Sequence, residues 1–70
     1  MLRQEVRSSE LRWVGYEEST RLLEVEFHSG EVYSYFGVPP RLVLELLEAA
    51  SIGRFFNAHI RPKFAFEKVR

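Results

Sequence analysis

Four polar side chains near the carboxyl end have the types and the spacing that suit an anionic ligand. Arg54, Asn57 and Arg61 are separated by three and four positions, so on a helix of about 3.6 residues per turn they lie on one face. Lys63 follows just beyond them. Guanidinium and amide groups on one rigid face bind phosphate oxygens through charge-assisted hydrogen bonds. The spacing therefore predicts a phosphate-binding face at residues 54–63.

The same cations have a second interpretation, which follows from the distribution of charge along the chain. Residues 1–50 contain nine acids and five bases, whereas residues 51–70 contain one acid and five bases. The basic residues would then pair with glutamates of the acidic part and only keep a short helix soluble, and such exposed pairs contribute little to stability. The chain as a whole has a formal net charge of zero, so no strongly cationic balance argues for nucleic acid.

Tyr33 and Tyr35 are the second candidate for contact with nucleic acid, because they lie two positions apart on a predicted strand. Aromatic side chains on one face of a sheet can stack unpaired bases, each for roughly 1 to 3 kcal/mol. The alternative is that both rings pack in the core and that only their hydroxyl groups reach its edge. The register of the strand decides between these two interpretations.

Metal binding and catalysis find little support in the composition. The two histidines, His28 and His59, are far apart in the chain, and there is no cysteine or aspartate to complete a metal site or to orient a catalytic base. The serines fall in no recognisable nucleophile motif. We therefore predict no catalytic residue, no metal site and no cofactor, and we expect that the protein is not an enzyme.

Length and composition limit the class of protein. Seventy residues, 46% of them apolar and 29% charged, are typical of a single globular domain over 1–70, with residues 1–9 as a frayed end or a short edge strand. No apolar run exceeds three residues, so we expect no membrane span or signal peptide and a cytoplasmic location. Abundant Glu and Arg beside single Asn, Gln and Met residues are a pattern of heat-adapted proteins.

Hydrophobic periodicity predicts an α+β fold. Alternation indicates strands at residues 11–16, 23–28 and 31–36, with Leu11 and Trp13 on one face of the first and Val14 and Tyr16 on the other. An apolar stripe predicts a covering helix over residues 40–51, which begins at the prolines and ends near Gly53. A short second helix follows from Ser51 to about Ile60. Residues 63–69 alternate again, with Phe64 and Phe66 on one side, which indicates a last short strand or an extended tail packed on the sheet. We therefore expect a three-stranded antiparallel meander covered by one main helix, with a short second helix and an extended carboxyl-terminal segment.

Two turn types are compatible with the sequence between the second and third predicted strands. A two-residue type I′ turn at residues 29–30 requires positive φ at both positions, and serine is a poor occupant of the first. That turn places Tyr33 and Tyr35 beside Glu26 and Glu24.

A type I turn followed by a glycine bulge requires positive φ only at Gly30. It pairs Val25 with Tyr33, and Leu23 with Tyr35, which joins the apolar faces of both strands. We therefore expect the bulge, with both tyrosines on the helix-facing side of the sheet.

The order and spacing of several short motifs resemble the KTSC domain, a small domain named for its place at the carboxyl end of some lysyl-tRNA synthetases and also found as a stand-alone bacterial protein. The motifs are Gly15-Tyr16, Phe27 with Gly30, Tyr33-Ser34-Tyr35, Val38-Pro39, Ala50-Ser51-x-Gly53, Phe56-Asn57 and Ile60-Arg61. Glu17 stands where the pattern leads us to expect aspartate. The resemblance implies a role in binding RNA and supplies no catalytic residues.

Together, these observations predict a non-enzymatic module that binds RNA by electrostatic contacts at residues 54–63. The alternative is a module for protein interaction or self-association, which would dock another protein chain through the same surface or through an exposed sheet edge. The sequence leaves the oligomeric state open.

Overall fold

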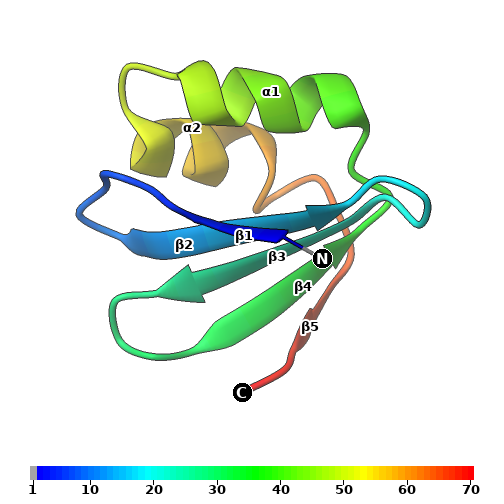
Figure 1. Ribbon diagram of the computed structural model, residues 1–70, viewed down its shortest axis with the longest axis horizontal. Helices are drawn as coiled ribbons and strands as arrows, with labels where there is room; N and C mark the ends of the chain where they lie inside the picture. Colours follow the sequence, from blue (N-terminus) through cyan, green and yellow to red (C-terminus); the bar gives the residue numbers. More distant parts are fainter. Residues whose placement is uncertain (1) are drawn as a thin grey trace.

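The protein forms one five-stranded antiparallel sheet with two helices on one of its faces (Figure 1). This is a computed structural model, and it describes residues 2–70. The strands lie in the sheet in chain order. The elements are β1 (Leu2–Glu5), β2 (Leu11–Glu17), β3 (Leu22–Phe27), β4 (Val32–Phe36), α1 (Pro40–Glu48), α2 (Ile52–His59) and β5 (Phe66–Lys68).

The β3–β4 hairpin has the predicted register. Gly30 has a φ of +96°, and Val25 pairs with Tyr33 while Leu23 pairs with Tyr35. The Gly30 N–H donates to the carbonyl of Phe27 at 2.8 Å, as expected for a type I turn with a glycine bulge. Both tyrosines therefore share the helix-facing side with the apolar residues of β3.

The prediction of a three-stranded meander is wrong, because two further strands flank the predicted three. β1 pairs with β2, and β5 pairs with β4. Both strands are short, and every described side chain in β1 and β5 is exposed. Backbone hydrogen bonding to a neighbour holds such strands in place. The sequence indicates a strand in each segment only as one of two alternatives, an edge strand at residues 1–9 and a last short strand at residues 63–69, because neither segment carries a long apolar face.

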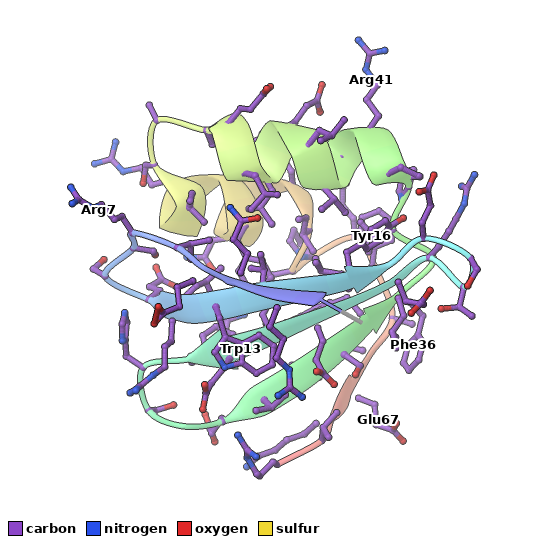
Figure 2. The ribbon with its side chains drawn as sticks, in the orientation of Figure 1. Arg7, Trp13, Tyr16, Phe36, Arg41 and Glu67 are labelled. Atoms are coloured by element: carbon purple, nitrogen blue, oxygen red, sulfur yellow. The ribbon has the colours of Figure 1, made fainter. Side chains whose placement is uncertain are left out.

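Val14 and Tyr16 share the helix-facing side of β2 as predicted, but the prediction that Leu11 lies on the same face as Trp13 is wrong, and a bulge is the reason. The register with β3 shifts between Leu11 and Trp13, so Arg12 is an extra residue that turns the following side chains over. Leu11 is buried in the core with Val14, whereas Trp13 lies on the sheet face that the helices leave uncovered (Figure 2). We call this uncovered side the open face. The Arg3 guanidinium lies 4.5 Å from the centroid of the Trp13 ring there.

The break between the two helices begins earlier in the chain than predicted. α1 ends at Glu48, and Ala49 is extended with a ψ of 143°, so the helix is three residues shorter than expected. Ser51 caps α2 as predicted, since its Oγ accepts a hydrogen bond from the backbone N–H of Arg54. Gly53 does not end α1; it lies in the first turn of α2, where a Cβ would meet the Ser8 Oγ at 3.3 Å.

The core lies between the helices and the sheet. α1 contributes Val43 and Leu46, and Phe56 and Ile60 come from α2 and its end; all four are buried. They pack on the helix-facing residues of β2, β3 and β4. Within residues 2–70, no helix is long and apolar enough to cross a membrane.

Candidate nucleic-acid interface

The basic residues divide into those that pair with glutamates and those that do not. The paired ones lie on the sheet and on α1, with nitrogen–oxygen distances of 3.0 to 4.0 Å: Arg3–Glu24, Arg12–Glu26, Arg70–Glu26, Lys68–Glu31 and Arg41–Glu45. Within the described part of the chain, Arg7, Arg54, Arg61 and Lys63 form no ion pair with a carboxylate. These four cations are all on α2, just after it, or in the loop that precedes β2. A fifth cation, Arg21 in the turn between β2 and β3, also forms no ion pair within residues 2–70 and lies apart from them.

Arg61 is held in place by three contacts. Its guanidinium carbon lies 5.1 Å from the centroid of the Phe27 ring and 5.8 Å from that of Phe56. Its Nη1 donates a hydrogen bond of 2.9 Å to the Asn57 Oδ1. Aromatic rings attract a cation over their faces, so the exposed guanidinium is positioned before any ligand arrives.

Asn57 links α2 to the loop before β2. Its Nδ2 donates hydrogen bonds to both carboxylate oxygens of Glu10, at 2.8 and 3.0 Å. The amide of Asn57 therefore lies between Glu10 and Arg61, so that the Glu10 carboxylate is linked to the guanidinium only through this amide. Asn57 lies on the predicted face with Arg61, but its side chain is already engaged within the protein.

Arg54 faces a polar hollow of about 520 Å³ between the start of α2 and the loop before β2. Arg7 lines the same hollow, together with Glu10 and the hydroxyl-bearing residues Ser8, Ser9 and Ser51. Figure 2 shows Arg7 pointing outward at this end of the molecule. The basic surface at α2 thus continues onto a segment that the sequence analysis assigned to a frayed end or an edge strand.

The two tyrosines occupy different environments. Tyr35 is 1% exposed and its ring packs at right angles to Phe56, with centroids 5.3 Å apart. Tyr33 is half-buried and stacks on Tyr35 at 6.5 Å. Phe66 of β5 is 58% exposed and contacts both tyrosine rings at 5.7 Å. The aromatic surface open to a base is therefore Phe66 with part of Tyr33, whereas Tyr35 belongs to the core.

Burial also raises the pKa of the Tyr35 hydroxyl above its ordinary value of 10.0, and the nearby Arg61 offsets part of this rise. The folded protein thus holds this proton more tightly than the unfolded chain. Below pH 10 both states are protonated and the stabilisation is complete; it is lost as the pH rises above 10 and through the folded pKa. We expect urea unfolding to show a fall in stability above pH 10 that is shallower in Tyr35→Phe; equal slopes would contradict this assignment.

The two histidines are not brought together. The His28 Nε2 lies 2.8 Å from the Ser8 carbonyl oxygen, and the His59 ring packs against Phe55 with centroids 4.6 Å apart. Among residues 2–70, no group of three histidine or carboxylate side chains has the arrangement of a metal site.

Three residues of this region escaped the sequence analysis. Arg7 and Glu10 come from the polar segment before β2, and Phe66 comes from β5 near the carboxyl end. Each is brought to α2 or to Tyr33 by strand pairing between distant parts of the chain. Only the positive charge of Arg7 and the aromatic type of Phe66 were visible as signals in the sequence.

The comparisons with known proteins agree with the motif pattern. The family model of the KTSC domain matches residues 7–64. The chain belongs to the KTSC family. The crystal structure of a KTSC domain protein from Yersinia pestis superposes with a TM-score of 0.94 at 39% sequence identity, covering 99% of this chain and 97% of that one.

Two kinds of relatives carry this KTSC domain. An uncharacterized protein of Stutzerimonas stutzeri (strain A1501) is 49% identical over 63 residues, which cover 90% of this chain and 89% of the relative. A lysine–tRNA ligase of Nostoc punctiforme is 44% identical over 61 residues, which cover 87% of this chain but only 11% of the ligase. The domain therefore occurs both in short proteins and as a small part of a large enzyme.

Proposed function

We propose that this KTSC domain binds RNA through the basic surface at α2, which comprises Arg7, Arg54, Asn57, Arg61 and Lys63, without acting as a catalyst. The observation that carries the proposal is the absence of ion pairs at the four cations of this surface among residues 2–70, while those of the open face and α1 are paired. Unpaired cations remain available to phosphate, and phosphate contacts dominate the affinity for nucleic acids.

The geometry supports contacts to the RNA phosphate backbone, supplemented by stacking of a base on an aromatic ring. Arg61 presents a planar guanidinium that is already oriented, which suits two parallel hydrogen bonds to a phosphate. Phe66 is exposed and contacts the Tyr35 ring, which also packs on Phe56 of α2, so the aromatic cluster that borders α2 offers a base a ring on which to stack. The occurrence of the domain in lysine–tRNA ligases, whose name states that they act on tRNA, supports RNA as the nucleic acid.

The test compares two double variants that remove the same number of positive charges. Arg54→Gln/Lys63→Gln changes the basic surface at α2, whereas Arg41→Gln/Lys68→Gln changes cations that are paired with glutamates elsewhere. Arg61 is left intact because it also packs on core rings. Binding of labelled single-stranded RNA and of tRNA is measured by fluorescence anisotropy at several salt concentrations.

We expect the first variant to weaken binding about tenfold and to reduce the salt slope by about 0.7 for each lost phosphate contact to single-stranded RNA. The second variant should change affinity by less than about twofold. Equal losses in both variants would mean that net charge rather than this surface controls binding. Absence of salt-sensitive binding by the wild-type domain at micromolar concentration would refute the proposal.

A further inference from the structure

The outer edge of β1 presents backbone groups that no other strand within residues 2–70 uses. The Val6 N–H donates to the Arg12 carbonyl of β2, and Gln4 pairs with Val14 in the same ladder. Because backbone groups alternate in direction along a strand, the N–H and C=O groups of Arg3 and Glu5 point away from β2. β1 is therefore a sheet edge with two residues ready to accept a further strand.

The sequence of this edge is complementary to itself. Residues 2–6 read Leu-Arg-Gln-Glu-Val. If two copies pair antiparallel with Gln4 opposite Gln4, each Arg3 lies opposite the partner's Glu5, and residues 2 and 6 lie opposite each other. We propose that a second copy of this chain binds here, so that β1 pairs with β1 about a two-fold axis and one sheet runs through both copies.

Hydrogen-bond direction and charge agree in this register. Arg3 and Glu5 are the residues whose backbone groups point outward, and each Arg3–Glu5 pair exchanges two backbone hydrogen bonds in an antiparallel ladder. Both side chains lie on the open face, where Glu5 pairs in register with Trp13. Within the described residues, Glu5 forms no ion pair, so its carboxylate can add to the contact that the partner's Arg3 already makes with Glu24 at 3.4 Å.

An apolar groove lies beside the same edge. It encloses about 640 Å³ between β1, β2 and α1, and is lined by Gln4, Val14 and Leu47 among others. Leu44 of α1 stands at this groove and is 60% exposed. Paired residues of adjacent strands place their side chains on the same face of a sheet. In the dimer, the helices of both copies would therefore lie on the same side of the continuous sheet. The partner's β1 and α1 would then cover Leu44.

The opposite edge of the sheet does not fit a second copy in this way. β5 is three residues long, Phe66–Lys68, and pairing it with itself about its central residue would place Glu67 against Glu67. Like charges directly opposite each other destabilise a strand pair. The self-association is therefore assigned to β1.

The first experiment measures mass by sedimentation equilibrium across a range of concentrations. The wild-type chain should rise from its monomer mass of 8.3 kDa toward twice that value. Glu5→Arg places like charges opposite each other in two symmetry-related pairs and should raise the dimer dissociation constant about tenfold or more. The exchange variant Arg3→Glu/Glu5→Arg restores opposite charges across the axis but removes the Arg3–Glu24 pair, so it should recover only part of the affinity that Glu5→Arg loses.

The second experiment uses the absence of cysteine from the chain. Gln4→Cys lies on the proposed axis in a non-hydrogen-bonded pair, where Cα atoms about 4.5 Å apart suit a disulfide. We expect this variant to form a covalent dimer under mild oxidation much faster than the exposed control Ser29→Cys, which lies in the β3–β4 turn. A wild-type chain that stays monomeric up to millimolar concentration, or a dimer that Glu5→Arg leaves unchanged, would overturn the proposal.

Discussion

Replacing Phe56 with alanine is expected to remove nearly all of the free energy of unfolding. Phe56 is fully buried, and its ring packs edge-on against Phe27 at 5.8 Å and Tyr35 at 5.3 Å. Truncation of a buried phenylalanine costs about 3 to 5 kcal/mol, and one core of this size supplies roughly the same amount. Urea unfolding followed by circular dichroism should show that Phe56→Ala is largely unfolded before denaturant is added.

Phe56→Leu separates the volume of this side chain from its aromatic contacts. It keeps a large apolar group under α2 but removes the ring contacts with Phe27 and Tyr35, which are worth about 0.5 to 1.5 kcal/mol beyond burial. The leucine variant should therefore stay folded with a reduced urea midpoint. If Phe56→Ala itself lost less than about 1 kcal/mol, the packing of α2 on the sheet would be different from the one described.

The second large effect is expected at Leu46, on the buried side of α1. Leu46 is 0% exposed, and a leucine-to-alanine change at such a position costs about 2 to 5 kcal/mol, because a cavity remains. Leu47 is only half-buried and lines the groove beside β1, so Leu47→Ala should cost clearly less. Leu44→Ala should lie within about 0.5 kcal/mol of the wild type, as is usual for surface substitutions.

Urea midpoints of the three alanine variants test the orientation of α1 directly. The apolar stripe in the sequence includes both Leu46 and Leu47 and does not rank them, so only the packing on the sheet predicts a difference. Equal losses at these two positions would indicate that the helix is rotated toward Leu47. A loss at Leu44 as large as that at Leu46 would contradict the described burial.

The parts of the fold that the sequence predicted are those in which one face is apolar and a turn has a single acceptable geometry. β3 alternates between buried and partly exposed residues, and only glycine adopts positive φ readily at position 30. These two facts determine the register of β4 and hence the burial of Tyr35. Ser51 likewise predicted the start of α2 because its hydroxyl caps the first turn.

The parts that failed depend on partners far away in the chain. β1 and β5 are strands because β2 and β4 offer them backbone groups, and segments this short carry too few apolar residues to decide between a strand and a frayed or extended end. The bulge at Arg12 shifts the faces of β2 by one residue. A single extra residue in a strand is invisible to a pattern that is read by alternation.

The predictions for the candidate site succeeded where local spacing decides and failed where distant parts of the chain meet. Helical spacing was sufficient to place Arg54 and Asn57 on α2, and to bring Arg61 close to Asn57. The role of Asn57 as a link to Glu10 could not be predicted, because it depends on where the loop before β2 passes. The same holds for the contact of Phe66 with the tyrosines, which requires β5 to lie beside β4.

The strand order has a consequence for how this domain can be combined with other polypeptides. Because β1 and β5 are the two outermost strands, both ends of the fold emerge at edges of the sheet, and neither end is threaded through the core (Figure 1). A further polypeptide can be fused to either end without separating a pair of strands. Such an arrangement makes the unit portable, and the same unit recurs both across 89% of a short bacterial protein and within 11% of a ligase.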